Sequence, residues 1–304
     1  MRINILFKSF LIVLLFSTSL WSEEIKFKAE NMDVKNNGNL IIAENSETDI
    51  PEKNINILSD KVSYNKEKQI IIFKNNVLLS DKNAGISIRS NNIKYNRLKD
   101  LIFSENSTKF EINNKYKIIS SNVYFDRTLN IIYSSENTKI EDNENNIYNL
   151  KDNFIFNIEE ELIKSKNSVV IDKNKNKYFF ENSIVNLKNN EIAGKELKVK
   201  FIDSYFGNEK NDPTLKGRSS YSNDRELKVY KAVFSTCNIE NKKCRGWELS
   251  ADEFKHDKEK KIFEYRNSWL KIFDYKVFYL PYFNHPDPTI KRKSGFLTPS
   301  YTSS

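Results

Sequence analysis

Apolar and polar positions along this chain repeat with a period of about thirty residues. In each of four units an apolar residue is followed, two positions later, by an aromatic residue, the alternation that is typical of a half-buried β-strand. The four pairs are Val62 and Tyr64, Ile93 and Tyr95, Val123 and Phe125, and Phe154 and Phe156. Their first members are 31, 30 and 31 residues apart, so the pattern predicts a repeated β unit.

The residues after each pair predict the rest of the unit. Polar turns are expected at 65–68, 96–100 and 126–130, because Asn and Asp tolerate turn conformations. Second apolar runs follow at 69–73, 101–103 and 131–133. An asparagine then recurs at intervals of 30, 31 and 30 residues, and it predicts the start of a third short strand such as 77–79. These asparagines are Asn76, Asn106, Asn137 and Asn167.

The repeat predicts an all-β fold. One unit cannot bury its own apolar face, so stacked units are expected to form a twisted stack of two sheets over a narrow apolar interior. The eight paired residues should line one side of it, either as ordinary core or as a ligand surface. The period loosens after about Asn190, the segment 203–225 predicts an irregular excursion, and the spacing returns at 251–269.

The first 22 residues have the layout of a secretory signal peptide. Arg2 and Lys8 precede the short apolar segment 10–16, and small residues follow before Glu23. The alternative is an uncleaved anchor. No later stretch is continuously apolar over the roughly 18 residues of a membrane-spanning helix, so an exported mature chain is expected.

The charge pattern does not indicate nucleic-acid binding. The net charge of +8 comes from 49 basic and 41 acidic residues that are mostly interleaved. No phosphate-binding loop or recognition helix accompanies them, and a charged, solvated surface explains the pattern.

Two cysteines and two histidines do not form a recognisable catalytic or metal site. Cys237 and Cys244 are separated by six residues, and in an exported chain a local disulfide is plausible. Pairing with cysteines beyond Ser304, or one free thiol, are the alternatives. His256 and His285 lack the spacing of a four-ligand zinc site, so neither a metal nor another cofactor is expected.

From Trp269 onward the chain becomes densely aromatic, and three prolines lie between Pro281 and Pro288. Proline removes a backbone donor, so these residues predict an extended, rigid connection without regular strand pairing. Gly295 then predicts a kink at the beginning of another strand.

The C-terminal motif resembles a known family. The residues V-F-Y-L-P-Y-F-N-H-P-D-P at 277–288, followed by R-K-S-G-F-L-T-P-S-Y at 292–301, are similar to the region before the barrel in LptD, the outer-membrane lipopolysaccharide-assembly family. The segment 234–251 is similar to that family's cysteine-containing turn. The repeats resemble the OstA-type β-jellyroll that the family shares with the periplasmic bridge protein LptA.

The resemblance implies a lipid conduit. Residues 23–58 would be an N-terminal extension, 59–268 a periplasmic jellyroll whose eight paired residues contact lipid, 269–294 a hinge, and 295–304 the start of an outer-membrane barrel where the chain is cut short. The hinge and barrel-junction residues would be Tyr279, Pro281, Pro286, Asp287, Pro288, Ser294, Gly295 and Phe296. Both cysteines lie close together with none before them, which puts a disulfide link to the barrel in doubt.

Several partners follow from the resemblance. They are lipopolysaccharide, an LptA-like bridge that docks by β-strand augmentation near 61–73, an LptE-like lipoprotein plug and the outer membrane. The function implied is non-enzymatic transport of lipopolysaccharide to a lateral gate. The alternatives are a freestanding periplasmic shuttle of the LptA type, and a stacked-β polysaccharide-cleaving enzyme, for which the chain shows no catalytic constellation.

Overall fold

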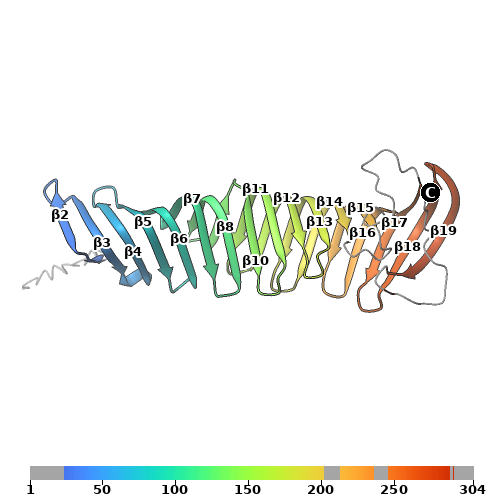
Figure 1. The fold of residues 1–304 in the computed structure, drawn as a ribbon, viewed down its shortest axis with the longest axis horizontal. Helices are drawn as coiled ribbons and strands as arrows, with labels where there is room; N and C mark the ends of the chain where they lie inside the picture. Colours follow the sequence, from blue (N-terminus) through green and yellow to red (C-terminus); the bar gives the residue numbers. More distant parts are fainter. Residues whose placement is uncertain (1–23, 202–212, 236–245, 288–289, 291–304) are drawn as a thin grey trace, which may run out of the picture.

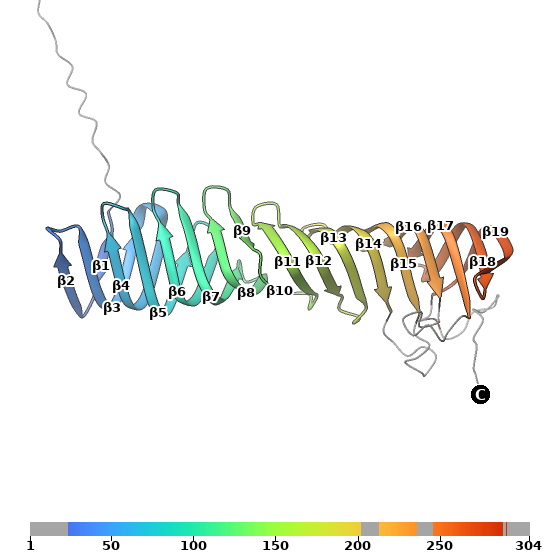
Figure 2. The same ribbon diagram turned by 90° about the horizontal axis from the view of Figure 1, so that it is seen from above.

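The structure is a computed structural model that describes residues 24–201, 213–235, 246–287 and 290. In that part of the chain, nineteen strands form one sheet. They stack side by side along one long axis, with β2 at one end and β19 at the other (Figure 1). The view from above shows the same order along the same axis (Figure 2). The all-β fold expected from the sequence is confirmed.

The strands and the single 3₁₀ turn have the following bounds: β1 Lys26–Lys28, β2 Asn31–Lys35, β3 Leu40–Ile50, η1 Pro51–Lys53, β4 Ile55–Asn65, β5 Ile70–Asp81, β6 Ile86–Asn96, β7 Leu101–Ile112, β8 Tyr116–Asp126, β9 Ile131–Ser134, β10 Thr138–Asp142, β11 Ile147–Asn157, β12 Leu162–Ile171, β13 Lys177–Asn186, β14 Glu191–Lys200, β15 Thr214–Ser222, β16 Glu226–Ser235, β17 Trp247–Asp257, β18 Ile262–Ile272 and β19 Tyr275–Pro286.

Consecutive strands pair antiparallel, so the sheet is a meander. At two places in the meander, two short strands take the position of one long strand. β1 and β2 pair with the two ends of β3, and β9 and β10 lie end to end between β8 and β11. The polar turns predicted at 65–68, 96–100 and 126–130 coincide with the turns that join these strands.

Most long strands bend near their middle, where one residue adopts a left-handed conformation. Asn76 has a φ of 49°, Asn106 of 61° and Asn167 of 47°, a region that asparagine adopts more readily than most residues. The pairing register shifts at several of these points. At these three positions the recurring asparagine marks a bend within a strand, so the prediction of a separate strand at 77–79 was wrong, because these residues belong to β5. Asn137 differs, since it lies between β9 and β10 and does precede a separate short strand.

The bends fold the single sheet lengthwise into two walls that face each other. The prediction of two separate sheets is corrected accordingly. One row of paired residues runs along each wall. The first wall carries Ile57, Leu79, Ile88, Phe110, Ile118, Ile140, Tyr148, Val170, Tyr178 and Val199. The second wall carries Tyr64, Ile71, Tyr95, Ile102, Phe125, Ile132, Phe156, Ile163, Val185 and Ile192.

Buried hydroxyl groups line the inside of the bend. Ser120 and Thr138 lie 2.6 Å apart, Ser168 and Ser183 lie 2.7 Å apart, and Ser46 and Ser59 lie 3.3 Å apart. Small side chains fit where the two walls converge, and their hydroxyls bond to one another and to backbone carbonyls, because a buried polar group needs a partner.

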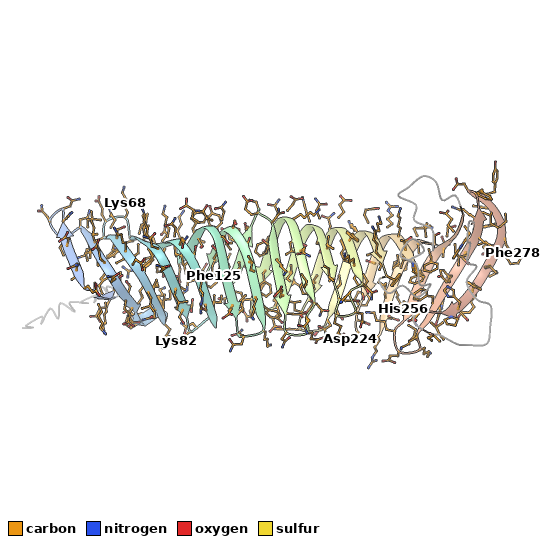
Figure 3. All side chains as sticks on the ribbon, in the orientation of Figure 1. Lys68, Lys82, Phe125, Asp224, His256 and Phe278 are labelled. Carbon is orange, nitrogen blue, oxygen red and sulfur yellow. The ribbon has the colours of Figure 1, made fainter. Side chains whose placement is uncertain are left out.

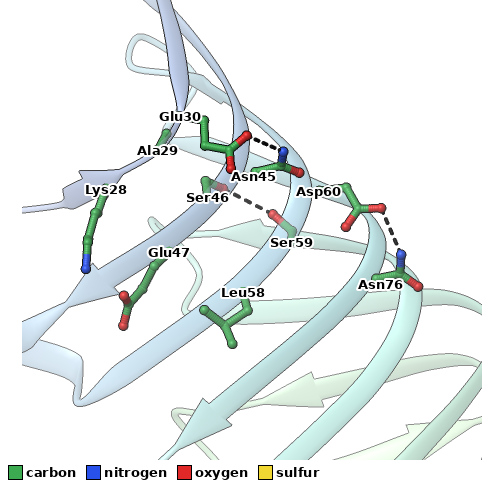
Figure 4. A pocket seen from close by; sticks show the side chains of 10 residues that line it. All are labelled: Lys28, Ala29, Glu30, Asn45, Ser46, Glu47, Leu58, Ser59, Asp60 and Asn76. Carbon is green, nitrogen blue, oxygen red and sulfur yellow. Dashed lines mark hydrogen bonds between the residues drawn. The ribbon is translucent and has the colours of Figure 1, made fainter.

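On the outside of the bend, asparagine amides bond to acidic side chains of the neighbouring strand. Asn45 donates to Glu30 at 2.6 Å and Asn76 donates to Asp60 at 2.8 Å, and Figure 4 shows both bonds at the β1 end of the sheet. Asn167 repeats the arrangement with Asp152. A shallow groove of about 480 Å³ lies beside the first two pairs. These bonds hold the left-handed asparagines in place.

The sheet also extends beyond the limits drawn from the sequence. Ile50, Ile55 and Ile57 are fully buried and β3 pairs along β4, so the sheet continues across the expected boundary at Ser59. The irregular excursion predicted for 203–225 contains β15, although residues 203–212 lie outside the described residues. At the other end, β19 pairs with β18 from Tyr275 to Pro286. Regular pairing therefore crosses Pro281, because its strand is the last of the described sheet and proline is tolerated at an edge.

Candidate functional site: a slot between two facing walls

The apolar interior between the walls, which we call the slot, contains all eight residues predicted to line it. Each is at most 5% exposed, and all belong to one continuous core. Tyr64, Tyr95, Phe125 and Phe156 lie in the row of the second wall given above, and Val62, Ile93, Val123 and Phe154 lie nearer the bend on the same wall. Tyr116 of the first wall meets Phe156 of the second edge-on, with ring centroids 5.8 Å apart.

The turns that end the walls form two rims, and the opening between them is the mouth of the slot. Two tyrosines of the second wall reach its rim with their hydroxyls. Tyr64 accepts a bond from Arg97 at 2.7 Å, and Tyr95 donates to Asp100 at 2.7 Å. Their rings stay in the apolar interior, so each tyrosine joins the interior to the charged rim.

Between β4 and β9 the mouth is closed by a network of charges. Arg127, on the second rim, contacts Asp81 at 2.6 Å and Asp100 at 2.7 Å. Lys53, on the first rim, contacts Asp100 at 3.3 Å, and the Arg127 guanidinium also donates to the Lys53 carbonyl at 3.0 Å. Burial raises the pKa of Asp100, but the bonds from Tyr95 and Arg127 outweigh it and hold that pKa below its usual range.

A second charged contact closes the mouth one unit further along. Glu161, on the second rim, accepts a bond from the Lys115 ammonium at 3.0 Å and another from the Tyr116 hydroxyl at 2.5 Å, both from the first wall. Burial and the neighbouring carboxylate raise the pKa of Tyr116. This hydroxyl therefore stays protonated and keeps donating at neutral pH.

Beyond Glu161 the rims part and the slot opens into a cavity of about 1110 Å³. Its volume lies slightly above the roughly 300–1,000 Å³ typical of small-molecule sites. Apolar side chains from both walls line it: Val170, Phe180, Val185, Ile192, Leu227 and Phe263. Phe180 lies over Gly194, where a Cβ atom would come within 2.2 Å of its ring, so glycine leaves the space that this ring occupies.

The rims of this cavity are polar and carry both signs of charge. Asp172 and Lys173 line it from the first rim, and Asp224, Lys258 and Lys261 from the second. Lys258 donates to the Ser222 hydroxyl at 3.0 Å, and burial lowers its pKa while the nearby carboxylate of Asp172 opposes that shift. An apolar interior with charged edges is suited to a ligand that has an apolar part and a polar part.

Aromatic rings fill the slot at the far end of the cavity. Phe201 of the first wall packs against Phe263 of the second, with centroids 5.7 Å apart. The fully buried Tyr265 faces His285, and the Nδ1 atom of His285 lies 2.7 Å from the Pro286 carbonyl, which can only accept. Nδ1 therefore carries the proton, and Nε2 accepts a bond from the Tyr265 hydroxyl at 3.0 Å.

Acid should weaken this end of the fold through His285. Burial lowers its pKa below 6.5, so the unfolded chain takes up a proton first and the free energy of unfolding falls as the pH drops below about 6.5. The loss is at most about 1.4 kcal/mol per pH unit for one proton. Denaturant unfolding between pH 7.5 and 5.5 should show this slope, and His285→Gln should lack it. An unchanged slope in His285→Gln, with His256→Gln as the control, would contradict the assignment.

The last strand, β19, exposes a row of large apolar side chains. Tyr275 is 77% exposed and Phe278 is 58% exposed, at the end of the slab marked by Phe278 in Figure 3. Among the described residues β19 pairs only with β18, and at the opposite end β1 and β2 pair only with β3. Both ends of the described sheet therefore present unpaired strand edges.

The docking edge predicted at 61–73 was wrong. Lys61 pairs with both Glu44 and Lys74, so β4 and the start of β5 are interior to the sheet. The unpaired edge at this end belongs to β1 and β2 instead. The sequence missed it because these two strands are short and fall before the first full unit of the repeat.

Several predicted residues lie near β19 or beyond the described chain. Tyr279 bonds to Asn267 at 3.2 Å, Pro281 and Pro286 lie within β19, and Asp287 bonds to His256 at 3.0 Å. The residues that lie outside the described part are the signal peptide at 1–22, Cys237, Cys244, Pro288, Ser294, Gly295 and Phe296.

Within the described residues, no helix has the length and apolar character needed to cross a membrane. In the same ranges, no group of three or more His, Cys, Asp or Glu side chains is arranged to hold a metal ion.

No family model matches the chain, but known proteins resemble part of it. Over 78 residues, 26% of this chain, it is 47% identical to the LPS-assembly protein LptD of Pseudoalteromonas translucida. Over 83 residues, 27% of this chain, it is 36% identical to the LptD of Psychrobacter arcticus. The chain has an LptD-like region. The aligned segments span 10% and 9% of these LptD proteins.

A solved structure gives a second comparison. LptH of Pseudomonas aeruginosa, described as the LptA homologous periplasmic component of a lipopolysaccharide transport device, aligns with a TM-score of 0.35 and 11% identity. The alignment covers 38% of this chain and 83% of that one. The matches to LptD proteins confirm the resemblance that the C-terminal motif suggested.

Proposed function

We propose that the chain conducts lipopolysaccharide across the periplasm toward the outer membrane, with the acyl chains in the slot and the sugars outside. The observation that carries this proposal is the cavity of about 1110 Å³, which has apolar walls, charged rims and an open mouth. Each methylene transferred from water into such an interior contributes about 0.8 kcal/mol, so several acyl chains can be held without a covalent step. The activity is transport, not catalysis.

The finer steps of the proposal follow the LptD resemblance. Lipid is received from an LptA-like bridge protein, passes along the slot and is released toward the lateral gate of a barrel that an LptE-like lipoprotein would plug. The bridge docks by adding a strand to the edge of β1 and β2, the unpaired edge at that end of the described sheet. Pro286 ends β19 and Asp287 follows it, and in this proposal the conduit turns toward the membrane from that end of the sheet.

Photo-crosslinking tests the proposal. A photoreactive phenylalanine analogue at Phe180 lies in the cavity, and the matched control at Phe179 lies on the outer face of the same strand, where Lys200 packs over its ring. In cells that export the protein, we expect lipopolysaccharide adducts at Phe180 that depend on the upstream bridge, and few at Phe179. Equal labelling at the two positions, or none at Phe180 in the folded protein, would refute the slot as the lipid path.

A further inference from the structure

The charged contacts across the mouth follow a constant spacing along the chain. Lys53 contacts Asp100, Asp81 contacts Arg127, and Lys115 contacts Glu161. The partners are 47, 46 and 46 positions apart in the sequence. The spacing is constant because each unit of the meander adds about thirty residues to both walls and the strands are inclined to the long axis. The rims therefore form a seam in which each position on one side has a fixed opposite position.

Opposite charges continue along the seam where the mouth is open, but they bond within their own wall. Glu144 of the first rim pairs with Lys173 of that rim at 3.5 Å. Lys188 of the second rim, about one spacing further along, donates to the Glu159 carbonyl at 2.5 Å. The same kinds of side chains are thus joined across the mouth in one section and separated in the next.

A closed mouth excludes a lipid headgroup. A lipid whose acyl chains lie in the slot must pass its linkage to the sugars between the rims. Where Arg127 contacts Asp81 at 2.6 Å and the Lys53 carbonyl at 3.0 Å, and Lys53 contacts Asp100 at 3.3 Å, the rims are in direct contact. The cavity beyond Glu161 has no such restriction, because its rims are lined by Asp172 and Lys258 around an open volume.

We propose that the contacts of Arg127 with Asp81 and the Lys53 carbonyl, of Lys53 with Asp100, and of Glu161 with Lys115 and Tyr116 form a latch that gates movement of the lipid headgroup along the mouth. The inference rests on the proposed function, since it concerns the same slot. In the latched state a lipid occupies only the open section between β11 and β18. Parting of the latch admits the headgroup to the section between β4 and β9, where Lys53 and Arg127 release the rim carboxylates.

The latch can part without unfolding the walls, because the backbone connects the two walls along the bend, away from the rims. The outer bonds of the bend, such as that from Asn76 to Asp60, do not involve the rims. Each latch contact involves at least one residue of a turn, namely Lys53, Lys115, Arg127 or Glu161, and turns move more readily than paired strands.

The first test measures the width of the mouth without lipid. Spin labels at Lys82 and Leu129, both exposed, are placed beside Asp81 and Arg127 on opposite rims. The double variant Arg127→Met with Asp81→Asn removes both charges, so no buried charge is left alone. We expect a longer and broader distance distribution in this variant, and an unchanged one in the control Lys231→Met with Asp252→Asn, whose ion pair of 2.8 Å lies on the outer side of the bend. An unchanged distribution in the latch variant would overturn the proposal.

The second test uses lipid and separates this inference from the proposed function. Photoreactive analogues are placed at Phe73 in the latched section and at Phe180 in the open section. The ratio of lipopolysaccharide adducts at Phe73 to those at Phe180 should rise about tenfold in the latch variant and more weakly in Glu161→Gln, as expected for a shift between two states. An unchanged ratio with adducts at Phe180 would overturn the latch alone. An absence of adducts at both positions would refute the lipid path, and the spin-label result would still decide whether the rims are latched.

Discussion

Replacing Arg127 with methionine is expected to lower the free energy of unfolding by about 3–5 kcal/mol. The Asp81 side chain is fully buried, and Arg127 supplies its opposite charge at 2.6 Å. Without the guanidinium, that carboxylate keeps only the backbone amides of Asn83 and Ala84, each at 3.0 Å. Asp100 is affected less, because Lys53 and Tyr95 still contact it. Equilibrium denaturation of the variant measures the loss.

A second substitution in the same chain shows whether the unpaired charge of Asp81 causes this loss of stability. Asp81→Asn added to Arg127→Met removes the unpaired charge while the amide keeps a similar shape, so a large part of the lost stability should return. If the double variant were as unstable as the single one, the loss would come from the packing of the Arg127 side chain instead of the buried charge.

Phe125→Ala is expected to cost about 3–5 kcal/mol, the range for truncating a buried phenylalanine. Phe125 is fully buried and lies between Ile102 and Ile132 in the row of the second wall. Since the slot is narrow, residues of both walls surround the space that its ring occupies, and the sheet cannot close over that space without moving the paired strands. Thermal or denaturant unfolding measures the loss.

The adjacent residue on the same strand provides the control. Tyr124 points to the opposite face, is 36% exposed and stacks on Tyr133 with centroids 5.1 Å apart. Tyr124→Ala should cost only about 0.5–1.5 kcal/mol, the value of an aromatic pair. Comparable losses at the two positions would mean that the alternation does not separate an interior face from an outer one.

Both predictions follow from the way one sheet forms two walls. The strands of a single meander are held together by backbone bonds along the whole sheet, whereas across the slot the facing walls contact each other through side chains. The interior of the slot is therefore stabilised by apolar packing, as at Phe125, and its mouth by a few charged contacts, as at Arg127. Because different contacts stabilise the interior and the mouth, the mouth can vary in width along the sheet while the strand pairing stays regular.

The alternating pairs were sufficient to predict the interior, because strand geometry places every second residue on the same face. Val62 and Tyr64, like the later pairs, are buried as expected. The recurring asparagine was also found from the sequence, but its role at Asn76, Asn106 and Asn167 was misjudged. A left-handed asparagine serves equally in a turn or at a bend within a strand, and only the pairing of β5 with β4 on both sides of Asn76 distinguishes the two.

The sequence by itself determined that the chain is β-structured, repeats every thirty residues or so, alternates an apolar and a polar face, and resembles LptD near its C-terminus. These are local properties, decided by residue type and spacing over a few positions. The tertiary structure alone decided that one sheet folds on itself, that Arg127 reaches Asp81, and that the slot is closed near β4 but open near β13. These features depend on which rim residues face each other, and that is set by the inclination and bending of many strands together, which no short stretch of the chain encodes.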